Sequence, residues 1–235
     1  VVSTPMDTVT EYDMAREMMD WGGAGIVHRF MSIEEQAGIM EKLWYIPGTD
    51  HIVVKNNLPR CAAIGVKGDY LERAQELVKN GCNVLLIDVA HGHHKLVGEA
   101  IEEIKTKLSG VEIVAGSVAT GEACEYLCEK GADAIRVGIG NGSLCETRIR
   151  TGVGIPQVSA LIDCVAVADT FDTPIIADGG VRTIGDVCKG LACGADTIML
   201  GSLLSGTKET PGTIEKIGEW PNEMLYKKYR GSASL

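Results

Sequence analysis

The chain has 235 residues, a formal net charge of −10 and 29 glycines. Its length is sufficient for one large core, and its 32 acidic against 22 basic residues argue against a nucleic-acid partner, since such partners are bound by clustered Lys and Arg. No apolar run approaches the roughly 20 residues needed to span a bilayer, and no signal peptide opens the sequence, so no membrane association is predicted.

The cysteines and histidines give weak metal signals. The chain has eight cysteines and no export signal, so we expect free thiols in a cytoplasmic protein. Cys124 and Cys128 stand four residues apart on a predicted helix and would supply half of a metal site, but we expect them to be small core residues. His91, His93 and His94 follow one strand without further ligands nearby in the sequence, so a surface or supporting role is expected.

Short apolar runs rich in Val and Ile alternate with segments that place apolar residues at helical spacing. The apolar runs are continuous, which is typical of parallel strands buried on both faces. In chain order the sequence predicts strands at 1–4 and 24–27, an irregular stretch at 45–59 with a short hairpin around 51–54, a strand at 61–66, a helix at 70–80, a strand at 84–88, a helix at 96–108, a strand at 112–118, a helix at 122–130, a strand at 132–139, a helix at 157–168, a strand at 174–178, a helix at 185–193 and a strand at 197–200.

A Gly-x-Asn/Asp junction repeats where predicted helices lead into strands, at 81–83, 131–133 and 194–196. Gly is favoured there because the residue that ends a helix often takes a positive φ. The elements amount to about eight βα units, the content of a (β/α)8 TIM barrel in a single domain. A doubly wound open sheet is the alternative, but the G-x-G-x-x-G fingerprint after its first strand is missing.

Glycine-rich polar loops follow the last predicted strands, where the active sites of barrels lie. Asp178-Gly179-Gly180 and Gly201-Ser202 follow the seventh and eighth strands. Their backbone N–H groups suit a phosphate, because an anion approaches the backbone most easily where there is no Cβ. Asp178 would repel a phosphate, so we expect it to accept hydrogen bonds from ribose hydroxyls.

The loop after the sixth strand carries the sharpest chemical signal. Three glycines and Ser143 lead to Cys145, and Thr147 follows two residues later. A cysteine in a polar loop is a candidate nucleophile once its thiolate is favoured. The charges of Arg148 and Arg150 would favour that thiolate.

These motifs resemble the IMP dehydrogenase/GMP reductase family. The resemblance covers nearly the whole chain and is carried by 4–11 (TPMDTVTE), 138–147 (GIGNGSLCET), 178–180 (DGG) and 229–231 (YRG). It implies a (β/α)8 barrel and a covalent reaction. In that reaction the loop cysteine attacks C2 of a purine nucleoside monophosphate, and hydride moves between C2 and a nicotinamide.

The resemblance also implies site residues. Cys145 would be the nucleophile, and Thr147 would position water or ammonia. The phosphate would be held by Ser143, Gly180, Gly201, Ser202 and Tyr229, and the ribose by Asp178. Further substrate-binding residues would be Gly179 and, in the segment that meets the purine, Gly231, Ser232 and Ala233. The nicotinamide ribose would face Asp88, Val89 and Ala90, and the potassium site of the family matches the carbonyls of Gly140, Gly142 and Cys145.

Within the family, the sequence favours a GMP reductase, which deaminates GMP to IMP and ammonia with NADPH. Dehydrogenases usually carry a CBS insertion between the second and third barrel units, where only 30–60 lies here. The motifs 88–92 (DVAHG), 148–152 (RIRTG) and 229–234 (YRGSAS) resemble the reductase forms. Against this, 28–29 (HR) and 32–36 (SIEEQ) are typical of dehydrogenases.

Two alternatives remain open: an IMP dehydrogenase that oxidises IMP to XMP with NAD and potassium, and a barrel that binds purine nucleotides without turnover. Members of the family are usually tetramers or octamers, and a homotetramer is the default expectation. The chain begins inside its first strand, and the catalytic flap of the family would follow Leu235. We therefore expect the sequence to be a segment trimmed at both ends.

Overall fold

Eight short parallel strands close into a barrel in the computed structural model, which describes residues 1–44, 58–219, 221 and 223–231. The strands are β1 (Val2–Ser3), β2 (Ala24–Val27), β3 (Cys61–Ile64), β4 (Val84–Asp88), β5 (Glu112–Val118), β6 (Ala134–Val137), β7 (Ile175–Asp178) and β8 (Thr197–Leu200). β8 pairs in parallel with β1, which closes the ring. The predicted (β/α)8 barrel is confirmed, and the open sheet is wrong. The hairpin predicted around 51–54 lies outside the described residues.

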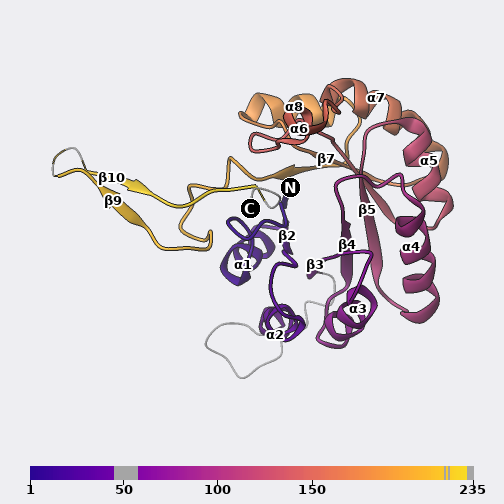
Figure 1. Cartoon of the computed structure of the whole chain (residues 1–235), viewed down its shortest axis with the longest axis horizontal. Coiled ribbons are helices and arrows are strands. Elements are labelled where there is room, and N and C mark those ends of the chain that lie inside the picture. Colours follow the sequence, from indigo (N-terminus) through magenta and orange to yellow (C-terminus); the bar gives the residue numbers. More distant parts are fainter. Residues whose placement is uncertain (45–57, 220, 222, 232–235) are drawn as a thin grey trace.

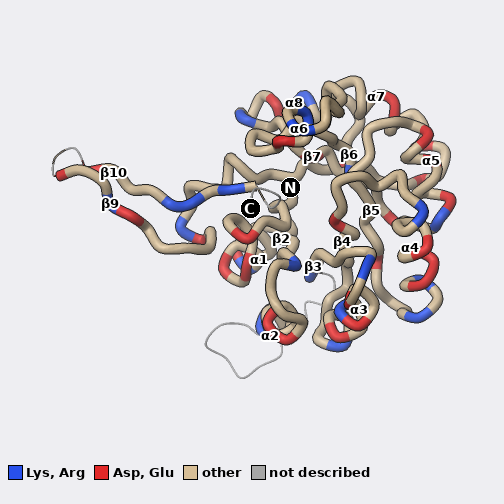
Figure 2. Tube along the Cα trace, in the orientation of Figure 1, with Lys and Arg blue, Asp and Glu red and all other residues tan. Residues whose placement is uncertain are grey.

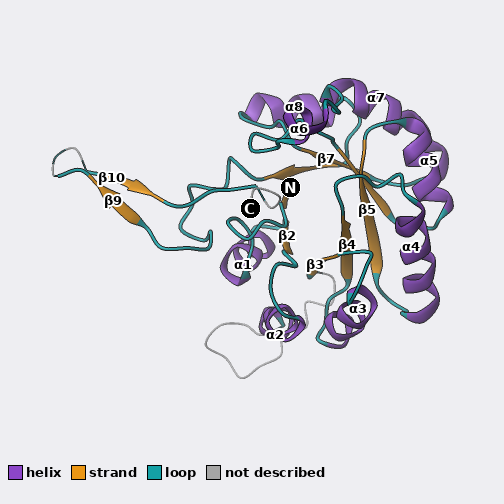
Figure 3. Cartoon of the chain, in the orientation of Figure 1, coloured by secondary structure: helices purple, strands orange, loops and turns teal. Residues whose placement is uncertain are grey.

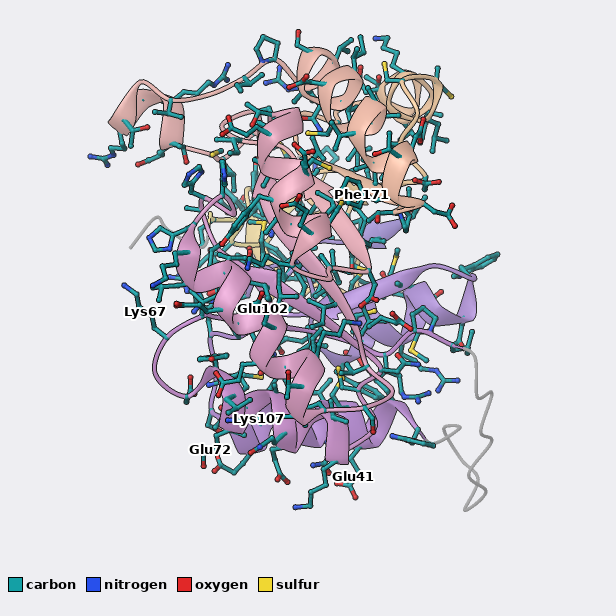
Figure 4. The ribbon with its side chains drawn as sticks, turned by 90° about the vertical axis from the view of Figure 1, so that its right-hand side faces the viewer. Glu41, Lys67, Glu72, Glu102, Lys107 and Phe171 are labelled. Carbon is teal, nitrogen blue, oxygen red and sulfur yellow. The ribbon has the colours of Figure 1, made fainter. Side chains whose placement is uncertain are left out.

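Helices surround the strands (Figure 3). They are α1 (Tyr12–Asp20), α2 (Ile33–Leu43), α3 (Tyr70–Lys79), α4 (Lys95–Lys107), α5 (Gly121–Glu129), α6 (Thr147–Thr151), α7 (Gln157–Ala168), a short 3-10 helix (Asp169–Phe171) and α8 (Ile184–Ala192). Figure 4 views this helical wall, on which Glu72 of α3 and Glu102 and Lys107 of α4 are exposed. Acidic and basic residues are interspersed over α3, α4 and α5 (Figure 2).

The strands are buried on both faces, which explains their continuous apolar runs. On β4, Leu86 points into the barrel interior, whereas Leu85 and Ile87 pack in the larger layer between strands and helices. The interior is filled by a small cluster of side chains drawn from around the ring: Val2, Ile26, Cys61, Ala63, Leu86, Val114, Ile176 and Met199. Full burial of a Val, Leu, Ile or Met side chain stabilises the fold by about 1.5–3 kcal/mol.

The predicted Gly-x-Asn/Asp junctions connect each new strand to the preceding one. Their glycines take positive φ of 93°, 90° and 96°, at Gly81, Gly131 and Gly194. Two residues later, a side-chain oxygen accepts the backbone N–H at the start of the previous strand, as Asp133 does from Ile113 at 2.6 Å. The equivalent bonds run from Arg60 to Asn83 and from Ile175 to Asp196, each at 2.7 Å. These bonds set the register of neighbouring strands at the amino-terminal end of the barrel.

The elements that were not predicted are α1, α2, α6, the 3-10 helix, and an antiparallel hairpin of β9 (Glu215–Ile217) and β10 (Met224–Tyr226). The hairpin projects away from the barrel (Figure 1). Its strands have three residues each, and all six residues are exposed. They therefore lack the long buried apolar run by which the barrel strands were recognised.

The cysteines are free thiols, as predicted. Cys124 is buried, and its Sγ lies 3.6 Å from the carbonyl oxygen of Cys164, so it is a core residue rather than a metal ligand. Among the described residues, no group of three His, Cys, Asp or Glu side chains is arranged to hold a metal ion. No helix in that same part of the chain is long and apolar enough to cross a membrane.

Candidate active site

A cavity of about 920 Å³ lies at the carboxyl ends of the strands. Its volume is in the range of sites that enclose a small organic ligand. Its walls come from the segments that follow β1, β2, β4, β6, β7 and β8. The predicted site residues that line it are Asp88, Val89, Ala90, Gly140, Gly142, Ser143, Cys145, Thr147, Asp178, Gly179, Gly180, Gly201, Ser202, Tyr229 and Gly231. Ser232 and Ala233 lie outside the described residues.

Cys145 is half-buried at the edge of this cavity, immediately before α6. Its Sγ lies 3.2 Å from Oγ1 of Thr147, and its backbone N–H donates to the carbonyl of Gly142 at 3.1 Å. Arg150 pairs with Glu146 at 2.8 Å, so its charge is partly compensated next to the thiol. The thiol and the Thr147 hydroxyl therefore face the same space.

Asn141 joins the cysteine loop to the loop after β7. Its Nδ2 donates to the carbonyls of Asp178 at 3.0 Å and Gly179 at 3.2 Å, and to the side-chain oxygen of Gln157. Gly179 has a φ of +88°, and a Cβ there would lie 2.6 Å from Oδ1 of Asn141. Only Gly fits this position without displacing one of the two loops.

Glycines and hydroxyls meet in the cavity where the loop after β8 approaches Tyr229 and Thr4. A Cβ at Gly201 would lie 3.3 Å from the Tyr229 hydroxyl oxygen and 3.1 Å from the methyl of Thr4. Burial raises the pKa of Tyr229, an effect reduced by its hydrogen bond with Ser143. The phenol is therefore protonated at neutral pH and remains a hydrogen-bond donor, as an anionic ligand requires.

Arg136 of β6 is the central charged residue of the site, and it was missed from the sequence. Its Nε donates to Asp178 at 2.8 Å, and a terminal nitrogen donates to Asp88 at 2.6 Å. Burial lowers the pKa of Arg136, but Asp178 and Asp88 together raise it above its usual value. The signal was an isolated Arg inside an apolar strand, where a charge needs a partner.

Asp88 also faces a second cation. Nε of Arg29 lies 3.9 Å from Oδ2 of Asp88, and the guanidinium stacks on the ring of Phe30 at 5.2 Å. Both Arg29 and Phe30 line the cavity. The side of the cavity next to β2 and β4 thus combines an aromatic surface, a carboxylate and a guanidinium.

The three carbonyls expected to hold potassium lie on one short segment, at Gly140, Gly142 and Cys145. Carbonyl oxygens are the ligands that K⁺ takes in selective channels. The Gly142 oxygen already accepts the N–H of Cys145, and it keeps one lone pair free. The donor set therefore fits a potassium ion.

The whole chain, residues 1–235, matches the sequence model described as the IMP dehydrogenase/GMP reductase domain. The chain belongs to the IMP dehydrogenase/GMP reductase family. Its predicted membership is thereby confirmed.

Similar curated proteins are named inosine-5'-monophosphate dehydrogenases. That of Cryptosporidium parvum is 41% identical over an alignment of 268 residues, which covers 100% of this chain and 65% of the relative. That of Borreliella burgdorferi is 37% identical over 274 residues, covering 100% and 67%. That of Helicobacter pylori strain 26695 is 52% identical over 174 residues, covering 74% and 35%. The chain thus spans between about a third and two thirds of the length of these relatives.

The names of these relatives favour the dehydrogenase alternative over the reductase expected from the sequence. The reductase prediction depended on the short segment between the second and third units and on motifs such as 88–92 and 148–152. The relatives from Cryptosporidium and Borreliella match this chain along its full length, so a barrel of this kind is shared with proteins named dehydrogenases.

Proposed function

We propose that this barrel is the catalytic part of an IMP dehydrogenase, which oxidises IMP to XMP with NAD. The observation that carries the proposal is the position of the Cys145 thiol, 3.2 Å from the Thr147 hydroxyl, in a cavity that is also lined by the glycine-rich loops and by Asp88. The names of the curated relatives support the dehydrogenase over the reductase.

The nucleotide would be bound by the loops after β6, β7 and β8. Backbone N–H groups of Gly180, Gly201 and Ser202, with the hydroxyls of Ser143 and Tyr229, are the donors for its phosphate. Asp178 accepts hydrogen bonds from the ribose hydroxyls, and Arg136 fixes the direction of that carboxylate. The segment containing Gly231 would then lie beside the purine, with C2 directed at the thiol.

The chemistry begins with the thiolate of Cys145 adding to C2 of IMP. The residues Asp88, Val89 and Ala90 would hold NAD, which would supply the hydride acceptor, and loss of hydride from C2 would leave a thioimidate between Cys145 and the purine. Thr147 positions a water molecule, which adds to C2. The C–S bond then breaks, releasing XMP and the free cysteine.

The cofactor would lie on the other side of the thiol, against Asp88, Val89 and Ala90. The Asp88 carboxylate is a suitable acceptor for ribose hydroxyls, and Arg136 holds it at 2.6 Å. A potassium ion would be held by the carbonyls of Gly140, Gly142 and Cys145, where it would order the cysteine loop. A homotetramer is the expected assembly.

GMP reductase is the second candidate, because the sequence of 88–92 and the two arginines of 148–152 resemble reductase forms. The dehydrogenase transfers hydride to its cofactor, whereas the reductase takes hydride from its cofactor. A purified full-length protein should therefore be given IMP with NAD, and separately GMP with NADPH, while absorbance at the wavelength of the reduced cofactor is followed.

A rise with IMP and NAD, accompanied by XMP, is the expected result. A fall with GMP and NADPH, accompanied by ammonia, would establish the reductase instead. Nucleotide binding without either change would indicate a barrel that binds without turnover. The Cys145→Ala variant is the control, because it lacks the nucleophile.

A further inference from the structure

The segment 227–231 is fastened to two loops of the barrel at both of its ends. At one end, Nζ of Lys227 lies among oxygens of the loop that follows β8. It is 2.6 Å from the carbonyl of Thr210, 3.1 Å from that of Lys208 and 3.4 Å from that of Thr207. It also lies 3.2 Å from the Thr210 hydroxyl, whose residue is buried. The ammonium group therefore joins the start of the segment to the loop after β8.

At the other end, Arg230 is bound to the loop between β1 and α1. Its guanidinium pairs with Oδ2 of Asp7. The hydroxyl of Thr8 donates to the carbonyl of Arg230 at 3.3 Å and lies 3.5 Å from its backbone nitrogen. These contacts join residues more than 220 positions apart, so they tie the carboxyl-terminal segment to the first barrel unit.

The carboxylate of Asp7 depends on this contact. Its side chain is only 18% exposed, and within the described residues its Oδ1 is buried without a hydrogen-bond partner. A carboxylate in such surroundings is unfavourable unless a cation lies against it. Arg230 supplies that cation, so the ion pair holds the segment against the β1 loop.

Tyr229 lies between these two attachments, next to Arg230. Its hydroxyl reaches Gly201 and Ser143, on the side of the cavity proposed for the phosphate. A tyrosine on an unattached segment would have to be ordered anew each time a ligand bound, and that ordering costs affinity. The ion pair removes this cost without contacting the ligand.

We propose that the Asp7–Arg230 ion pair is a positioning element that holds Tyr229 against the phosphate of the bound nucleotide and so determines the affinity for that phosphate. Neither Asp7 nor Arg230 is among the residues that line the cavity. The proposal rests on the proposed binding of a nucleoside monophosphate, and the experiment separates the two.

The experiment compares the dissociation constants of IMP and of inosine, its counterpart without phosphate, by titration calorimetry. The variants are Arg230→Gln and Asp7→Asn, with Arg230→Lys as the conservative change. We expect Arg230→Gln to weaken IMP binding about tenfold, equal to about 1.4 kcal/mol, and to weaken inosine binding much less, because inosine lacks the phosphate that Tyr229 meets. In turnover, the KM for the nucleotide should rise while kcat is retained. Arg230→Lys should restore part of the affinity.

Lys216→Gln is the matched control. It breaks the Lys216–Glu223 ion pair of 2.7 Å on the projecting hairpin, in the same carboxyl-terminal part of the chain. It should bind both ligands as the original protein does. Thermal unfolding of each variant checks that it is folded, and Asp7→Asn serves if Arg230→Gln does not fold.

The outcomes are distinct. If the unaltered protein binds IMP no better than inosine, the phosphate site of the proposed function is wrong. If it prefers IMP and the Arg230 and Asp7 variants keep that preference in full, the positioning role is wrong. Equal weakening of IMP and inosine would also overturn it, because that pattern indicates a general disturbance of the barrel.

Discussion

Replacing Arg136 by Met should destabilise the protein more than removal of any exposed ion pair. The guanidinium connects Asp88 and Asp178, with N–O distances of 2.6 and 2.8 Å. All three side chains are largely buried, with 12%, 16% and 18% exposure for Arg136, Asp88 and Asp178. Met fills a similar volume, but it leaves Asp178 without its cation and leaves Asp88 with Arg29 alone, at 3.9 Å.

The size of the loss follows from that burial. Removing one partner of a buried pair typically costs 3–5 kcal/mol, because the remaining charge is left uncompensated. We therefore expect the free energy of unfolding of Arg136→Met to fall by about 3–5 kcal/mol. Arg136→Lys keeps the charge but loses the fork that reaches both carboxylates, so its loss should be smaller.

Urea unfolding, followed by circular dichroism, measures these losses. The matched control is Lys95→Met, which breaks an exposed pair with Glu99 at 3.2 Å, and it should cost less than about 1 kcal/mol. A loss of under about 1 kcal/mol for Arg136→Met, equal to the control, would refute the reasoning, because it would mean that water enters the cavity and screens both carboxylates.

Two further predictions concern the nucleophile and the amino-terminal end of the barrel. Cys145→Ala should abolish turnover and retain nucleotide binding in calorimetry, because the proposed phosphate and ribose contacts lie elsewhere; residual turnover above background would contradict the covalent mechanism. A hydrogen bond with Asp133 and repulsion from its charge raise the pKa of Glu112 in the folded protein. The stabilisation that protonated Glu112 provides is therefore complete below its unfolded pKa of about 4.3. It is lost as the pH rises through the higher folded pKa. The melting temperature of Glu112→Gln minus that of the original protein should therefore increase between pH 4 and 7 in calorimetric scans. A difference that does not change with pH would count against this account.

Much of the barrel could be predicted from the sequence because its strands share one clear sequence pattern. A parallel strand buried on both faces needs a continuous apolar run, and β4 and β5 match their predicted limits at every residue. The Gly-x-Asn/Asp junctions were recognised from conformational preference, and their positive φ confirms it. The hydrogen bonds that the third residue of each junction makes were not visible, because they depend on the position of the previous strand.

The parts of the site that consist of one short contiguous motif were predicted. The contacts between residues far apart in the sequence were missed. The cysteine and phosphate loops could be placed because each is contiguous in sequence. Arg136 is separated from Asp88 and Asp178 by 48 and 42 positions. Only closure of the barrel brings the three together, so their pairing does not show in the sequence. The Asp7–Arg230 pair was hidden for the same reason.

The link made by Asn141 bears on how such a barrel distinguishes substrates. It bonds the cysteine loop directly to the backbone of the loop after β7, so these two loops behave as one piece. A nucleotide held through its ribose and phosphate would then present its purine at a fixed position relative to the thiol, whichever purine it carries. Under the proposed function, selection between purines would then fall to residues outside these two loops, such as Gly231, which also lines the cavity and can change in sequence without moving the nucleophile.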